Sequence, residues 1–122
     1  CGTITDVNAL PAGDIRRGMP RFKPENYPAN LALLKAYTAV ANELGCTPAQ
    51  LALAWLLHKA PHIIPIPGTT DESHMRDNIA AAGITLSPQV LAQVDALINQ
   101  HTVSGPRYDA QATSEVDTEN FA

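Results

Sequence analysis

The chain has 122 residues, of which 45% are hydrophobic and 5% aromatic, so it is long enough for one globular domain. Eight basic and twelve acidic residues give a net charge of −4. This balance argues against a nucleic-acid or anionic-membrane surface, because such surfaces need an excess of Lys and Arg. The longest apolar run, Leu51 to Leu57, is far shorter than the ~20 residues of a membrane span.

Residues 1–26 show no sustained hydrophobic periodicity and are rich in Gly and Pro, as is typical of loops and turns. Four basic side chains gather in this stretch: Arg16, Arg17, Arg21 and Lys23. A loop of this length within a compact domain is unusual and is often functional. Two interpretations stay open, a solvated surface loop and a loop that covers an anionic ligand.

Two helices are predicted next. Residues 28–44 carry apolar side chains at three- and four-residue spacing, with Asn26 or Asn30 as a candidate cap and Gly45 as the stop. Thr47 to Gln50 has the pattern of a capping box with proline at the first helical position, and Pro61 ends this second helix.

The second helix is apolar all round from Leu51 to Leu57, which predicts burial on several sides, between a sheet and other helices. Trp55 is interpreted as a core residue. Cys1 and Cys46 do not make a disulfide framework, and we interpret them as free thiols of a cytoplasmic protein.

One short strand is predicted at Ile63 to Ile66, with Pro65 limiting how much of it can pair. A capping box at Thr69 to Glu72 then predicts a helix to about Ala82, with Met75, Ile79 and Ala82 facing inward. Ser87–Pro88 predicts the start of a last helix, whose inner face carries apolar side chains. These are Leu91, Val94, Leu97 and Ile98.

After Gln100 the helical pattern stops, and the acidic tail predicts either an extended arm or a disordered end. The order helix, strand, helix is part of an alternating α/β pattern, in which a strand needs neighbours. We expect those neighbours upstream of residue 1. Because the chain starts with Cys1 and not Met, we expect either a piece of a longer protein or the loss of a leader.

The turn Pro67–Gly68–Thr69–Thr70 is the best candidate for chemistry. Glycine permits close approach of a ligand, and hydroxyls beside the free amides of a first helical turn favour a phosphate. Asp71 and Glu72 would repel that phosphate, although His74 and Arg76 would offset them. On these grounds alone an ordinary capped turn and an anion site are equally good interpretations.

Other constellations are weaker. His58 and His62 are four residues apart, but Pro61 interrupts the helix between them, so no metal site is predicted. Three tyrosines are proton donors in principle: Tyr37, interpreted as core, and Tyr27 and Tyr108, interpreted as surface. No convincing catalytic set is found.

Two segments carry a family resemblance. The run from Thr47 to Leu57, and Ile64 to Thr70 followed by Asn78–Ile79, resemble the C-terminal third of bacterial aldo-keto reductases. Gly13 to Arg17, Pro20 to Phe22 and Arg107–Tyr108 are similar to that family as well. The resemblance covers essentially all of residues 1–122 and implies an α/β fold, the C-terminal part of a (β/α)8 TIM barrel, mostly helical here with Ile63 to Ile66 as the eighth strand.

The resemblance further implies an NAD(P)H-dependent oxidoreductase that reduces aldehydes or ketones to alcohols. It places one set of residues at the adenosine and phosphate end of the cofactor: Pro67, Gly68, Thr69, Thr70, His74, Asp77 and Asn78. Asp71 and His74 depart from the family pattern and remove positive charge that would hold a 2′-phosphate, so NADP(H) is expected with NAD(H) as the alternative.

The family's catalytic Asp, Tyr, Lys and His come from earlier strands, so this chain alone is expected to be inactive. Its expected partners are a small carbonyl substrate in the full protein, and either the missing N-terminal part of the barrel or a second copy of itself. The alternative hypothesis is a free-standing helical module that makes protein contacts or binds an anion without catalysis.

Overall fold

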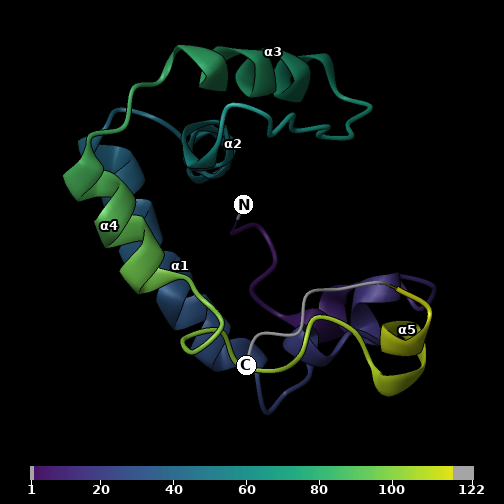
Figure 1. The fold of residues 1–122 in the computed structure, drawn as a ribbon. Helices are drawn as coiled ribbons and strands as arrows, with labels where there is room; N and C mark the ends of the chain where they lie inside the picture. The colour runs from purple at the N-terminus through teal and green to yellow at the C-terminus, as the bar shows by residue number, and fades with distance from the viewer. Residues whose placement is uncertain (1, 117–122) are drawn as a thin grey trace.

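A computed structural model describes residues 2–116 of the chain, and Figure 1 shows its helices. Within these residues the α-helices are α1 (Tyr27–Glu43), α2 (Pro48–Lys59), α3 (Glu72–Ala80), α4 (Pro88–Leu97) and α5 (Ala110–Ser114). Short 3-10 turns are η1 (Val7–Ala9), η2 (Ile15–Arg17), η3 (Pro20–Phe22) and η4 (Ala81–Gly83). The helices predicted from sequence are therefore present, with ends within a few residues of the predicted ones.

The ends of the helices follow local chemistry. The capping box of α2 is confirmed, since the Thr47 hydroxyl accepts from the Gln50 amide and the Gln50 side chain accepts from the Thr47 amide. Gly45 ends α1 with a φ of 68°, and the amide of Cys46 donates to the Ala41 carbonyl. Ser87 caps α4 as predicted, through a bond from the Val90 amide.

The helices form an arc. In Figure 1, α1 and α4 lie side by side, α3 crosses over α2, and the N-terminal loop lies beside α5 at the other end. Side chains of α1, α2, α4 and the segment before α4 share one small core. Its buried members are Tyr37, Val40, Ala41, Leu51, Ala54, Leu86 and Val94. None of the helices within residues 2–116 is both long and apolar enough to cross a membrane.

The end of the N-terminal loop and the first turn of α1 are joined to the C-terminal segment by hydrogen bonds. Asn30 donates to the Ser104 carbonyl at 3.0 Å and accepts from the Ser104 amide at 2.9 Å, while the Ser104 hydroxyl donates to Asn26 at 2.7 Å. Asn26 occupies the N-cap position of α1, as predicted, but its side chain makes no capping bond, and Asn30 lies inside the helix. The tail after Gln100 is predicted from sequence to be an extended arm or a disordered end, but up to Val116 it is neither, because these bonds and α5 order it. Asp117 and Glu119 lie outside the described residues.

The predicted strand at Ile63 to Ile66 is not formed, since no residue between 2 and 116 belongs to a strand. Ile64 and Ile66 are 81% and 91% exposed, and the Ile63 amide donates to the Ala60 carbonyl in a turn. A strand exists only as part of a ladder, and this part of the chain supplies no second strand to pair with.

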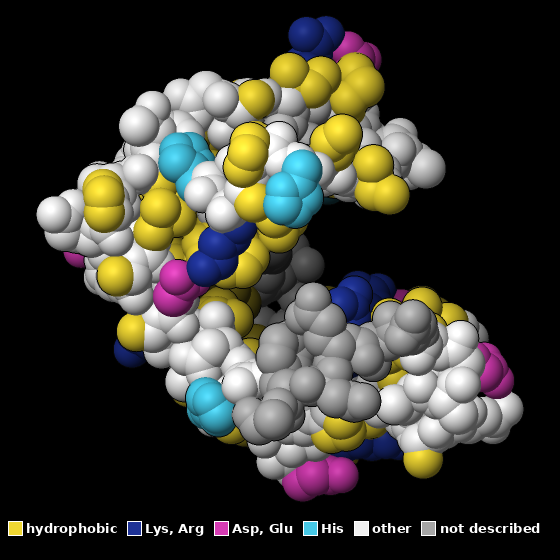
Figure 2. All heavy atoms as spheres, viewed as in Figure 1, with side chains coloured by type: hydrophobic (Ala, Val, Ile, Leu, Met, Phe, Trp, Pro, Cys, Tyr) yellow, Lys and Arg dark blue, Asp and Glu magenta, His cyan; other side chains and the backbone are white. Residues whose placement is uncertain are grey.

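The predicted burial of α2 on several sides is also wrong for this chain. Leu51 and Ala54 are buried, but Trp55 is only half-buried and Leu57 is exposed. The predicted inward positions Met75, Ile79 and Ala82 are exposed too. Figure 2 shows hydrophobic side chains at the surface of the arm of the arc that holds α2 and α3. These helices have nothing to pack against on their outer sides in residues 2–116.

Candidate functional site

The turn that precedes α3 is closed by a carboxylate of the chain itself. Asp71 is the N-cap, and its Oδ1 accepts from the Ser73 amide at 2.7 Å and from the His74 amide at 3.2 Å. The predicted capping box from Thr69 to Glu72 is therefore wrong. The Thr69 hydroxyl instead accepts from the Asp71 amide at 3.1 Å. The preference of Asp for N-caps was the available sequence signal.

The electrostatics of this turn oppose an added anion. The Ser73 hydroxyl and the amides of His74 and Ser73 hold the pKa of Asp71 below its ordinary value, so Asp71 is a carboxylate at neutral pH. Arg76 pairs with Glu72 on the exposed side of α3 rather than offsetting Asp71. The amides of Ser73 and His74 are thus occupied, and a phosphate would have to displace Asp71 to reach these two.

The structure brings only part of the predicted cofactor set together. Pro67, Thr69 and Asn78 line one hollow of about 440 Å³ between α2, α3 and the extended segment before α3. Its other walls are apolar: Leu53, Leu57, Pro65, Met75, Ile79 and Ala82. Gly68 has open space where a side chain would be, which leaves its backbone accessible.

Thr70, His74 and Asp77 are exposed and are not among the residues that line this hollow. The backbone carbonyl of Asp77 accepts from the Gln50 side chain at 3.2 Å, which ties α3 to α2. The hollow can therefore offer a ligand the backbone of Gly68 and the hydroxyl of Thr69 at its edge, while most of the rest of its lining is apolar.

Both ring nitrogens of His58 are already used inside the chain. Nδ1 lies 2.8 Å from the Ala54 carbonyl, and Nε2 lies 3.2 Å from the Leu86 amide, which donates to it. The Leu86 bond requires an unprotonated Nε2, so Nδ1 carries the hydrogen and His58 joins α2 to the segment before α4. Within residues 2–116 no group of three or more His, Cys, Asp and Glu side chains is placed to hold a metal ion.

The three tyrosines have different surroundings. Tyr37 lies in the core as predicted, and burial raises its pKa to about 12, with Cys46 nearby adding to the shift. Tyr27 is half-buried rather than a surface residue, stacks on Phe22 with ring centroids 5.3 Å apart and donates to the Ile4 carbonyl at 2.5 Å. The guanidinium of Arg107 lies over the ring of Tyr108.

Three of the four basic side chains of the N-terminal loop bond within the chain. Arg16 pairs with Asp14 at 2.6 Å, and its bonds lower the pKa of Asp14 to about 2. Arg17 donates to the Leu10 carbonyl at 2.7 Å, and Arg21 donates to the Gly105 carbonyl at 3.3 Å. Lys23 is exposed and makes no ion pair within residues 2–116.

Comparison with known proteins gives two findings. Residues 5–99 match the Aldo/keto reductase family. The aldo-keto reductase yakc of Schizosaccharomyces pombe, whose name specifies NADP(+), is 34% identical over 115 residues. That alignment covers 94% of this chain and 34% of the yeast protein, so the chain spans about a third of the length of this relative.

Proposed function

Because the chain belongs to the aldo/keto reductase family, we propose that it is the C-terminal segment of an oxidoreductase that reduces aldehydes or ketones to alcohols with NADP(H), or alternatively NAD(H). The observation that carries the proposal is the match to an NADP(+) reductase along nearly the whole chain. The family implies a (β/α)8 barrel, and the partner of this segment is then the N-terminal part of that barrel.

The exposed apolar surface supports this placement. Ile64 and Ile66 would be covered as a barrel strand, and the outer faces of α2 and α3 would gain neighbours. In such barrels the loops after the last strands lie at the ligand-binding face. The turn Pro67–Thr70 would then lie at that face, with Asp77 and Asn78 beside it.

The residues of the turn fit the adenosine of a dinucleotide better than they fit an additional 2′-phosphate. Gly68 is open to a ligand and the Thr69 and Thr70 side chains are exposed, whereas Asp71 already occupies two amides at the start of α3. The cofactor would supply hydride to the substrate carbonyl carbon. The role of this chain is to hold the nucleotide by its backbone at Gly68 and its hydroxyls at Thr69 and Thr70.

The test of the activity is the oxidation of NADPH by the whole protein and by residues 1–122 alone, with a panel of aliphatic and aromatic aldehydes and ketones. We expect turnover by the whole protein and none by the 122-residue chain, because the chain holds no catalytic set. Turnover by the isolated chain, or its absence from the whole protein with both NADPH and NADH, would contradict the proposal.

The test of the site is Asp71→Ser, which keeps a capping oxygen and removes a negative charge. We expect the whole protein to bind adenosine 2′,5′-bisphosphate about tenfold more tightly after this change, because a carboxylate near a phosphate costs roughly 1 kcal/mol or more. Asp109→Ser is the matched control, since Asp109 caps α5 in the same way through the Ala112 amide. Equal affinities for the two variants in calorimetry would place the phosphate elsewhere.

A further inference from the structure

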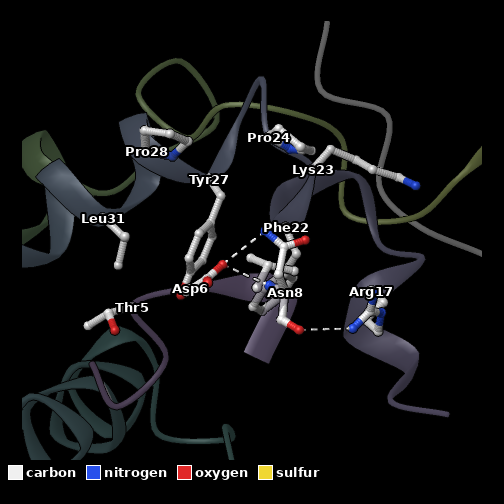
Figure 3. A pocket seen from close by; sticks show the side chains of 11 residues that line it. Thr5, Asp6, Asn8, Arg17, Phe22, Lys23, Pro24, Tyr27, Pro28 and Leu31 are labelled. Atoms are coloured by element: carbon white, nitrogen blue, oxygen red, sulfur yellow. Dashed lines mark hydrogen bonds between the residues drawn. The ribbon is translucent and has the colours of Figure 1, made fainter. Parts of the chain in front are cut away.

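A second hollow, of about 540 Å³, lies between the N-terminal loop and the start of α1 (Figure 3). This volume is within the range of small-molecule sites. All of its lining residues come from one stretch of chain: Thr5, Asp6, Val7, Asn8, Arg17, Phe22, Lys23, Pro24, Tyr27, Pro28 and Leu31. None of them belongs to the turn before α3, so an inference about this hollow stands apart from the proposed cofactor site.

The walls of the hollow are held in place by bonds within the loop. Tyr27 donates to the Ile4 carbonyl, and Arg17 Nη1 donates to the Leu10 and Asn8 carbonyls at 2.7 and 3.3 Å. Asp6 Oδ1 accepts from the amide and the side chain of Asn8 at 2.9 and 3.1 Å. A site whose walls are fixed before binding loses less conformational entropy when a ligand arrives.

The apolar wall is built from flat side chains. Phe22 and Tyr27 stack at an interplanar angle of 22°, and Pro24, Pro28 and Leu31 complete the surface. In the view of Figure 3 the Tyr27 ring stands between Leu31 on one side and the basic side chains on the other. Such a wall suits the flat apolar body of a ligand, which gains from aromatic contact as well as from burial.

The charged groups of the hollow favour an anion. Two cations, Lys23 and Arg17, face one carboxylate, Asp6, in a chain whose overall charge is −4. Lys23 has no carboxylate partner within residues 2–116, and the Nε and Nη2 atoms of Arg17 make no hydrogen bond there. These donors are therefore available to a ligand, and a carboxylate is a natural acceptor for them.

We propose that this hollow binds an aromatic carboxylate, with its ring against the Phe22–Tyr27 stack and its charged group at Lys23 and Arg17. Lys23 supplies the mobile charge, because its long side chain is exposed and makes no ion pair with the described residues. Arg17 supplies a fixed second donor, since two backbone carbonyls orient its guanidinium. Both the ring and the charge of the ligand are needed for full affinity.

The experiment titrates the 122-residue chain with benzoate, with its neutral analogue benzamide and with inorganic phosphate. Binding is followed by calorimetry and by the NMR resonances of the Phe22 and Tyr27 rings. We expect benzoate to shift both ring resonances and to bind at least about fivefold more tightly than benzamide, because only benzoate carries the charge. Phosphate lacks the ring and is expected to bind more weakly than benzoate.

Matched variants separate charge from fold. Lys23→Gln is expected to lower benzoate affinity about fivefold and to leave benzamide unchanged, whereas Lys35→Gln, an exposed lysine of α1 outside this hollow, changes neither. Phe22→Leu is expected to weaken both aromatic ligands. The proposal is overturned by equal binding of benzoate and benzamide, by phosphate binding as tightly as benzoate, or by Lys23→Gln behaving like Lys35→Gln.

Discussion

Gly105 lies where the C-terminal segment packs against Asn26 at the end of the N-terminal loop. The substitution Gly105→Ala tests this contact. Its φ is 83°, a conformation that side chains disfavour. An added Cβ would lie 2.6 Å from Asn26 Nδ2 and 2.9 Å from Asn26 Cγ. Contacts this short force the Asn26 side chain out of its place, so the substitution perturbs both the backbone and a hydrogen-bonded partner.

The magnitude follows from the bonds that Asn26 makes. It donates to the Pro20 carbonyl at 2.9 Å and accepts from the Ser104 hydroxyl at 2.7 Å. Each such bond contributes about 1 kcal/mol, and a left-handed backbone costs a non-glycine residue about 1–2 kcal/mol. We expect the contact to be destabilised by about 3 kcal/mol.

The assay is amide hydrogen exchange at Ser104, whose amide donates to Asn30 across the same contact. Because about 1.4 kcal/mol is a factor of ten, protection of this amide should fall by about 100-fold in Gly105→Ala. Gly13→Ala is the control, since a Cβ there meets nothing within 4 Å and Gly13 has no positive φ. Exchange at Ser104 within about threefold of the Gly13→Ala rate would refute the reasoning.

Three further predictions concern the core and α2, and all are measured by urea unfolding. Burial raises the pKa of Tyr37 from 10 in the unfolded chain to about 12 in the folded one. The stability that the neutral hydroxyl contributes, about 3 kcal/mol, is therefore present below pH 10 and is lost as the pH rises through about 12. Tyr37→Phe should remove that loss. Leu51→Ala should cost about 3 kcal/mol because Leu51 is fully buried, whereas Leu57→Ala, 39% exposed, should cost less than about 1 kcal/mol. Thr47→Ala removes the hydroxyl of the capping box and should cost about 1 kcal/mol.

Local chemistry made the helices predictable from the sequence. The Thr47–Gln50 box, the glycine at position 45 and the Ser87–Pro88 start each depend on neighbours within a few residues, and each is present as predicted. The prediction at α3 was wrong because two capping patterns overlap there, and Asp71 is a stronger cap than Thr69. Propensity alone did not reveal which oxygen would reach the amides.

Contacts between distant residues could not be predicted in the same way. Asn30 and Ser104 are 74 positions apart, and nothing in either local sequence indicates that they bond. The hollow beside Tyr27 has the same origin, because it depends on how the loop folds back onto α1. The cluster of basic residues was visible in the sequence, but only the structure distinguishes Arg16, which is paired, from Lys23, which is not paired within residues 2–116.

The segment from Ile63 to Pro67 provides a last test of the barrel placement. In an extended chain the backbone groups of alternate residues face opposite edges. Ile64 and Ile66 would present two N–H donors at one edge, whereas the other edge has only the N–H of Ile63, because Pro65 and Pro67 have none. From Ile64 onward the N–H donors of this strand can therefore bond to one neighbour only.

We expect the amide hydrogens of Ile64 and Ile66 to exchange rapidly in the 122-residue chain, where both residues are exposed. In the whole protein their exchange should be at least about 100-fold slower, because a neighbouring strand would accept hydrogen bonds from them. The Leu91 amide, which donates to the Ser87 carbonyl inside α4, is the internal control and should be protected in both samples. Equal, rapid exchange of Ile64 and Ile66 in both samples would mean that this edge has no partner strand. The segment would then not be a paired barrel strand, whatever the remainder of the protein does.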